Sequence, residues 1–221
     1  MGALEDWLSY ELVDFLMFSP DVYFRMVASY VQYSWPIAAL YVSGLAAALW
    51  WWYRQGDMRP VNIAVAVGWA LPAYMFFLVR YADIMTASPG FAALFGVEVV
   101  LLGWAALRPP PAISMPSGLG AGGWALMCVA AAYPVVAPSA GRAWDMGEPL
   151  GLMPDPIVLL TTAWFVLCGE RRVLPWLAPA IWAIASGLTL HTMGEPDYWL
   201  LPILVAVAAI LNFTGKRRLA A

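Results

Sequence analysis

The residues best suited to chemistry lie in a polar stretch from Pro138 to Pro156, which separates two strongly apolar runs. Arg142, Asp145, Glu148 and Asp155 stand there in a chain of which only 11% is charged. The planar guanidinium of arginine binds carboxylates and phosphates bidentately, and carboxylates accept protons and hydrogen bonds. We therefore expect a binding site of this chain to include this stretch.

Two further polar segments carry similar residues. Arg80 and Asp83 follow the second apolar run, and His191, Glu195 and Asp197 precede the last one. Packed apolar helices would bring all three segments to one surface. In one reading they are solvated loops whose arginines pair with nearby acids and contribute little. In the other they form a shallow pocket in which the arginines bind a small polar or anionic ligand and the histidine titrates.

The tetrapeptide Met-Gly-Glu-Pro occurs twice, at Met146 to Pro149 and at Met193 to Pro196. Each copy stands in a loop that leads into an apolar run. Duplication of a two-helix unit would produce this arrangement, and so would chance in a chain of such biased composition. Both explanations remain open.

Glu98, in the segment FGVEVVLLG, is the one acid clearly inside an apolar run. An ionisable group is costly in hydrocarbon and usually marks a function there. Glu98 could carry protons or a coupling cation. It could equally be protonated and hydrogen-bonded to a neighbouring helix.

No motif for a metal or a cofactor is recognised. The two cysteines, Cys128 and Cys168, have no zinc spacing, and the methionines on the same predicted side as His191 form no MxxM or MxxxM pair that would favour Cu(I). No nucleophile or phosphate motif supports catalysis, so the sequence favours a protein that is not an enzyme. With a formal charge of −3 and scattered cations, the chain offers no basic surface for nucleic acid.

The overall composition predicts a membrane protein. The chain has 221 residues, of which 63% are hydrophobic, and its mean hydropathy is +0.74. A soluble domain of this size contains far fewer apolar residues. We therefore expect the lipid bilayer to be the chain's first partner, and other membrane proteins to be possible further partners.

The elements that must position the polar residues are about seven apolar runs, each predicted to be a transmembrane helix. A bilayer crossing needs roughly 20 apolar residues. The predicted fold is an all-α polytopic membrane helix bundle, with residues 20–221 forming a single domain. The runs are about Gln32 to Tyr53, Val61 to Val79, Phe91 to Leu107, Gly122 to Ala137, Pro156 to Cys168, Val173 to Leu190, and Tyr198 to Phe213.

Residues 1–19 are predicted to form an interfacial amphipathic helix. Apolar residues recur at helical spacing between Leu4 and Leu16, and acids such as Glu5 lie on the other side. An anionic cytoplasmic leaflet repels this acidic side, which favours the outer side of the membrane. Ser19 and Pro20 then supply an N-cap and a first-turn proline for the next helix.

Cations in alternate loops predict the orientation. Three arginines lie on one side, at Arg25, Arg80 and Arg142, against eight cations on the other side. An excess of cations in short loops places the more basic side in the cytoplasm. The N-terminus is then outside and the C-terminus is cytoplasmic, as in a multi-pass protein of the bacterial inner membrane. The basic side holds eight cations: Arg54, Arg59, Arg108, Arg171, Arg172, Lys216, Arg217 and Arg218.

Several short motifs together suggest a family. They are Phe18-Ser19-Pro20 with Tyr23, Arg80-Tyr81, Gly151 to Pro156, and Met193-Gly194-Glu195-Pro196. In these motifs the chain resembles an uncharacterised family of bacterial integral membrane proteins, known only as a domain of unknown function. The resemblance covers nearly the whole chain and implies a polytopic bacterial membrane protein. The family often has Pro-Cys-Pro where this chain has Pro154-Asp155-Pro156, so the resemblance implies no thiol chemistry here.

Three functional hypotheses follow. The first is an inner-membrane protein that binds or transports a small polar or anionic solute through an outward-facing site, which includes Arg80, Arg142 and Glu98. The second is an accessory subunit of a larger membrane complex of the respiratory or photosynthetic type. The third is a membrane enzyme that acts on a lipid-linked substrate at the outer interface, with Asp145, Asp155 or His191 as acid or base.

Overall fold

The computed structural model describes residues 18–108 and 119–215, and every regular element among them is a helix. The all-α prediction is therefore confirmed for this part of the chain. Most of the interfacial helix predicted for residues 1–19 lies outside the described residues. Its last residue, Ser19, stands at the predicted N-cap position of the first described helix, but its side chain makes no cap hydrogen bond.

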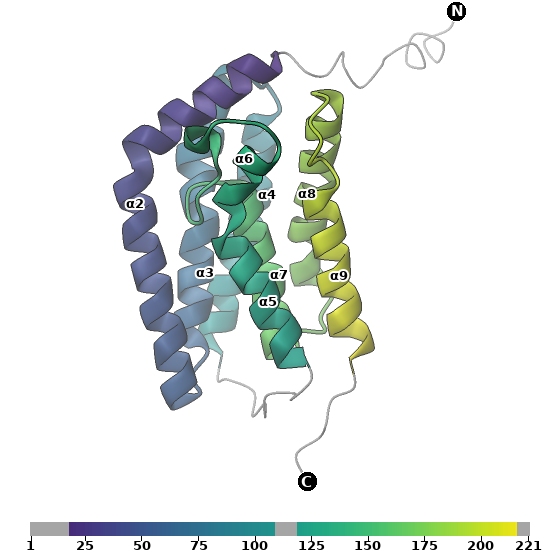
Figure 1. The fold of residues 1–221 in the computed structure, drawn as a ribbon. Helices are drawn as coiled ribbons and strands as arrows, with labels where there is room; N and C mark the ends of the chain where they lie inside the picture. Colours follow the sequence, from purple (N-terminus) through teal and green to yellow (C-terminus); the bar gives the residue numbers. More distant parts are fainter. Residues whose placement is uncertain (1–17, 109–118, 216–221) are drawn as a thin grey trace, which may run out of the picture.

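Each predicted apolar run is helical over most of its length, and the run predicted from Gly122 to Ala137 is divided between two α-helices and a 3₁₀ turn (Figure 1). Short 3₁₀ turns at Tyr81–Asp83, Tyr133–Val135 and Trp144–Met146 connect some of them. The main elements are α2 (Pro20–Gln55), α3 (Arg59–Leu71) with its π-helical continuation Pro72–Leu78, α4 (Ser88–Leu107), α5 (Leu119–Ala131), α6 (Val136–Ser139), α7 (Pro154–Cys168), α8 (Leu174–Thr192) and α9 (Leu200–Thr214).

The ends of α2 and α7 follow from local sequence. Proline occupies the first helical turn of both, where its missing N–H leaves no intrahelical hydrogen bond unmade. Both helices end at a glycine in the left-handed region, Gly56 with φ 72° and Gly169 with φ 66°. The Gly56 N–H donates to the Trp52 carbonyl, which would otherwise lack a partner at the helix end. These caps fix where the two helices stop.

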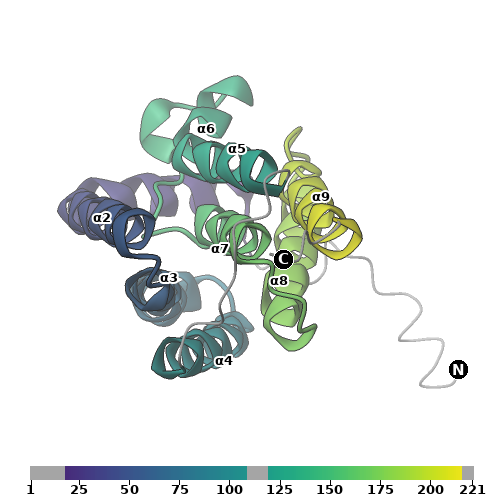
Figure 2. The same cartoon turned by 90° about the horizontal axis from the view of Figure 1, so that it is seen from below.

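Helix α7 forms the centre of the bundle. Figure 2 shows it enclosed by α2, α3, α4, α5, α8 and α9. Every residue from Pro154 to Leu167 is buried, on all sides of the helix. A helix that is apolar all round is expected in such a place, because it has no side suited to water.

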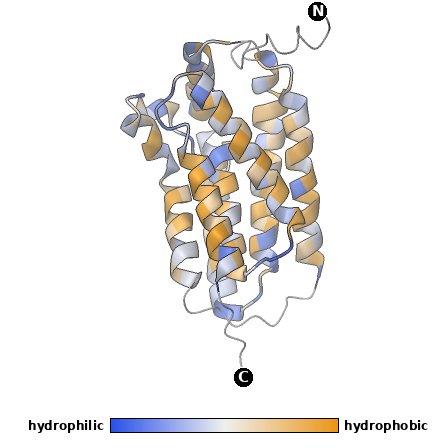
Figure 3. Cartoon of the chain, turned by 90° about the vertical axis from the view of Figure 1, so that its right-hand side faces the viewer, coloured by the Kyte–Doolittle hydropathy of each residue, from blue (hydrophilic) through white to orange (hydrophobic). Residues whose placement is uncertain are grey.

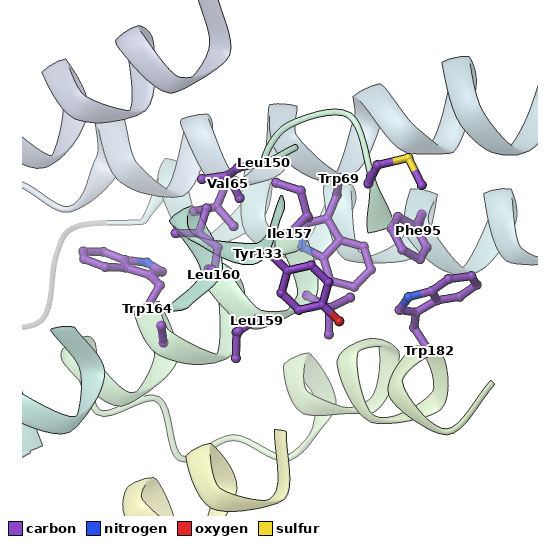
Figure 4. Packing of buried hydrophobic residues seen from close by; sticks show 14 of the residues in the cluster. Val65, Trp69, Phe95, Tyr133, Leu150, Ile157, Leu159, Leu160, Trp164 and Trp182 are labelled. Carbon is purple, nitrogen blue, oxygen red and sulfur yellow. The ribbon is translucent and has the colours of Figure 1, made fainter. Parts of the chain in front are cut away.

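Indole groups join α7 to its neighbours. Trp69 Nε1 donates to Thr161 Oγ1 at 2.7 Å, and Trp164 Nε1 donates to Asn62 Oδ1 at 2.8 Å. Figure 4 shows Trp69, Trp164 and Trp182 around the buried aliphatic side chains of α7. Because each buried N–H has an acceptor, these large side chains fill the core without an unsatisfied donor.

The outside of the bundle is also apolar along its length. Figure 3 shows strongly hydrophilic positions mostly towards the two ends, with hydrophobic positions between them. Such an exterior exceeds what a soluble monomer usually exposes. Large side chains exposed on the outer helices include Leu40, Trp50, Ile63, Val100, Trp104 and Ile184.

Within the described residues, two helical segments are long and apolar enough to cross a membrane, Arg59–Asp83 and Ser88–Leu107. A third is added if Gly120–Ala131 and Tyr133–Ser139, which are bent by 56° relative to each other, form one span. Helices α7 and α9 are apolar but shorter, with 15 residues each. Length and composition thus support two to three spans.

Candidate functional site

Arg142 is the centre of a group of charged side chains from two loops, one that precedes α7 and one that precedes α9. Its Nη1 donates to Glu195 and, at 2.9 Å, to Asp197 Oδ1, and its Nη2 donates to Asp197 Oδ2 at 2.7 Å. The guanidinium lies 4.6 Å from the centroid of the Phe24 ring. Only 12% of the side chain is exposed, and Gly141, with φ 83°, turns the chain just before it. Both terminal nitrogens are therefore occupied by carboxylates.

The two Met-Gly-Glu-Pro segments converge on this arginine. Glu195, from the second segment, is hydrogen-bonded to Arg142. Glu148, from the first segment, lines a small cavity that Arg142 also lines. Gly194 has φ 77°, a conformation that glycine adopts without strain, and the Glu195 N–H donates to the Leu190 carbonyl at 3.0 Å. The repeated tetrapeptide thus supplies two glutamates to one site.

Asp155 stands in the first turn of α7 and is only 3% exposed. Its carboxylate accepts three hydrogen bonds: from Trp182 Nε1 at 2.8 Å, Ser186 Oγ at 2.8 Å and Tyr133 Oη at 3.1 Å. These donors come from α8 and from the turn after α5. These three hydrogen bonds fix the three segments relative to each other.

A cavity with room for about one water separates these groups. The space open to the centre of a water molecule is about 10 Å³, and Tyr133, Arg142, Glu148, Asp155 and Asp197 are among its lining residues. Two of their atoms, Glu148 Oε2 and Arg142 Nε, are buried without a hydrogen-bond partner among the described residues. The cavity is therefore polar and is bordered by groups that can still bind.

The electrostatic balance of the site is acidic. One guanidinium faces four carboxyl groups, those of Glu148, Asp155, Glu195 and Asp197. Burial raises the pKa of the Glu148 carboxyl well above its ordinary value, and the Asp155 charge raises it further, while the Arg142 charge lowers it. An added anion would have to displace Glu195 or Asp197 from the arginine. The arrangement instead favours a ligand that donates hydrogen bonds or carries positive charge.

We call Arg142, Glu148, Asp155, Glu195 and Asp197 the Arg142 cluster. Four of these residues were predicted as ligand-binding residues from the sequence. The other four predicted residues do not line the cavity: Asp83, Asp145 and His191 are exposed, Arg80 is partly exposed, and the His191 ring lies 4.8 Å from the Tyr198 ring.

Asp197 was predicted in the loop that supplies the site but not as a member of the site, and the three donors to Asp155 were not predicted. A signal for two of them exists. Trp182 and Ser186 are four residues apart in an apolar run, so they share one side of α8. Polar groups at this spacing indicate a buried acceptor on the neighbouring helix.

Glu98 lies away from the Arg142 cluster, in the middle of α4. It is fully buried, and neither carboxyl oxygen has a hydrogen-bond partner among the described residues. The hydrogen bond to a neighbouring helix that the sequence allowed is therefore not seen there. An unpaired buried carboxylate would be very costly, so Glu98 is expected to be uncharged.

Comparison with known proteins gives one match. A family model described as Family of unknown function (DUF6064) matches residues 20–221, which confirms that the chain resembles an uncharacterised family. No curated protein and no solved structure matches the chain.

Proposed function

The chain belongs to this family of unknown function, and we propose that it is a multi-pass inner-membrane protein that binds a small polar solute at the Arg142 cluster. The solute donates hydrogen bonds or carries a positive charge. The cluster faces the outer side of the membrane, with the C-terminal end of α9 at the cytoplasmic side.

The apolar exterior supports the membrane part of this proposal. Large hydrophobic side chains cover α2, α4, α8 and α9 along their length, and hydrophilic residues concentrate near the ends (Figure 3). Helix α8 has 19 residues, or about 28 Å at about 1.5 Å per residue, close to the hydrocarbon thickness of about 30 Å. Helix α7 is shorter but is surrounded by protein, so its length does not have to match the lipid. We propose seven crossings in all, and the length and composition of the described helices support two to three of them.

One observation carries the solute-binding part. Arg142 is already paired with Glu195 and Asp197, so Glu148 and Asp155 remain as two further carboxyl groups at the cavity. Asp155 has three donors, whereas Glu148 Oε2 has none among the described residues. A buried acceptor without a partner is destabilising, and a bound donor would relieve it.

The membrane orientation is tested by labelling single cysteines on intact cells. In a background without Cys128 and Cys168, Asp83→Cys and Gln55→Cys place exposed thiols near opposite ends of the bundle. An impermeant thiol reagent is expected to label only the Asp83→Cys variant. Equal labelling of both variants would contradict the proposed topology.

Binding is tested with ammonium, a cationic donor about the size of a water molecule. Thermal unfolding of the purified protein in detergent is compared in ammonium chloride and sodium chloride at equal ionic strength. Ammonium is expected to raise the melting temperature of the wild type more than sodium does. Glu148→Gln should abolish this difference, and Asp83→Asn, at an exposed acid outside the cavity, should retain it. The same ammonium effect in the Glu148→Gln variant would refute the site.

A second function, that of a subunit in a larger membrane assembly, is favoured by the exposed aromatic side chains. Trp35, Trp50 and Trp104 all lie on the outside of the bundle. Aromatic residues are enriched at protein interfaces, and also where helices meet lipid headgroups. Purification under mild detergent separates these roles, because a subunit is expected to elute in a stoichiometric complex and an independent protein is expected to elute alone.

A further inference from the structure

Helices α2 and α3 leave an open apolar groove between them on the outside of the bundle. Its volume is about 710 Å³, and it is lined by α2 between Ile37 and Trp51 and by α3 between Pro60 and Leu71. Gly44 is one of the lining residues, and a Cβ atom added there would meet no atom within 4 Å. The described part of the chain therefore leaves this groove unfilled.

The groove lies at the depth that the proposed membrane placement gives to hydrocarbon. From Ile37 to Trp51 the helix rises by about 21 Å at about 1.5 Å per residue. One leaflet contributes half of the hydrocarbon core, or about 15 Å. The groove is thus long enough to take an extended acyl chain along α2.

Two arginines stand at the cytoplasmic end of the groove. Arg54 follows Trp51, the last lining residue of α2, by three residues, and Arg59 directly precedes Pro60, the first lining residue of α3. Both are exposed. The one acid in the turn between them, Asp57, accepts the Arg59 backbone N–H at 3.0 Å. This end is therefore net basic, whereas Ile37 and Leu71 at the other end carry no charge.

We propose that this groove binds an anionic phospholipid of the cytoplasmic leaflet. One acyl chain lies between α2 and α3, and the phosphate and headgroup are bound by Arg54 and Arg59. Basic residues beside a groove between membrane helices are suited to anionic headgroups, and arginine binds phosphate bidentately. The exposed Trp50, whose ring centroid is 5.9 Å from the Arg54 guanidinium, places an aromatic group at the headgroup level.

The physics of the bilayer predicts which part of the lipid provides specificity. An acyl chain gains little by leaving other acyl chains for an apolar groove, since both environments are equally apolar. The groove therefore sets the position of the lipid, and the two arginines set the preference for a negative headgroup. This inference rests on the membrane placement proposed above, but not on ligand binding at the Arg142 cluster.

The experiment compares phosphatidylglycerol with phosphatidylcholine of the same acyl chains, added to the purified full chain in detergent. Native mass spectrometry counts bound lipids, and thermal unfolding reports their stabilising effect. The wild type is expected to bind phosphatidylglycerol at least several-fold more. Arg54→Gln combined with Arg59→Gln should remove that preference. Gly44→Leu, which fills the groove where a side chain has room, should reduce binding of both lipids.

Matched controls come from the same chain. Arg25→Gln removes an exposed arginine near the other end of α2, and Gly103→Leu adds a side chain at an α4 position that is equally open. Both controls should bind lipid like the wild type. Glu148→Gln should also keep the preference for phosphatidylglycerol, so failure at the Arg142 cluster and failure at the groove are distinguished.

Three results would overturn the inference. The first is equal binding of the two lipids by the wild type. The second is a preference that survives removal of both arginines. The third is a cross-link from Gly44→Cys to a helix of another protein or of a second copy in native membranes, because a protein helix would then occupy the groove instead of a lipid.

Discussion

Removing the Arg142 side chain is expected to destabilise the protein strongly. Arg142→Ala leaves Glu195 and Asp197, whose side chains are 15% and 14% exposed, without their counter-charge. Loss of one partner of a buried ion pair costs about 3–5 kcal/mol. The residual hydration of these carboxylates places the expected loss near the lower limit, at about 3 kcal/mol. For a domain of this size that corresponds to a fall in melting temperature of about 6–12 °C.

The assay is thermal unfolding of purified variants in the same detergent, with Arg142→Lys and Arg80→Ala beside Arg142→Ala. Lysine keeps the charge but not the planar fork, so we expect an intermediate loss of about 1.5 kcal/mol, the value of one hydrogen bond to a charged group. Arg80 has no ion pair among the described residues, and its removal should change stability by at most about 0.5 kcal/mol.

A cost of less than about 1 kcal/mol for Arg142→Ala would refute the role of a buried ion pair, because that is the range of exposed ion pairs. A double-mutant cycle with Asp197→Asn gives an independent check. The Asp197 change should cost less once Arg142 is absent, because the two side chains are directly bonded. Additive costs would show that this pair contributes no coupling.

Three further predictions concern buried groups. The raised pKa of Glu148 means that the folded state holds a proton the unfolded state has released. Stability should therefore fall as pH rises from about 4.5 towards the raised pKa, by at most about 1.4 kcal/mol per pH unit, and Glu148→Gln should flatten this dependence in unfolding measured across pH. Asp155→Ala leaves three buried donors without an acceptor, so denaturant unfolding should show a loss of at least about 3 kcal/mol. Gly151→Ala requires a Cβ atom 2.2 Å from a Tyr41 ring carbon at φ 91°, and should lower the melting temperature markedly, whereas Gly44→Ala, with open space, should not.

Helix positions were largely predictable because apolar runs are long and are bounded by proline and glycine. The run predicted from Pro156 to Cys168 is observed as α7, Pro154–Cys168. Its central place was not predicted. Hydropathy reports how apolar a run is, but residues that face lipid and residues that face protein are equally apolar, so the innermost helix is not distinguished from an outer one.

The site was predictable only in part, for a related reason. The acids and Arg142 stand out because charge is rare in this chain, so four members of the cluster were found. Which of them pair depends on how two distant loops pack. Arg142 and Asp197 are 55 residues apart, and no local pattern specifies their contact. Arg80 has the same residue type and a similar loop position, yet it lies outside the cavity.

The enclosed position of α7 constrains the order in which the bundle can be assembled. Helices α2, α3, α4 and α5 precede it in the chain, α8 and α9 follow it, and all six surround it (Figure 2). Because α8 and α9 are made last, the enclosure of α7 can be completed only after both have been synthesised. The bonds from Trp182 and Ser186 to Asp155 form only at this closing step. A nascent chain that stops before α8 consequently leaves the Asp155 carboxylate with only one of its three donors, and it has no means of completing the centre on which the other helices pack.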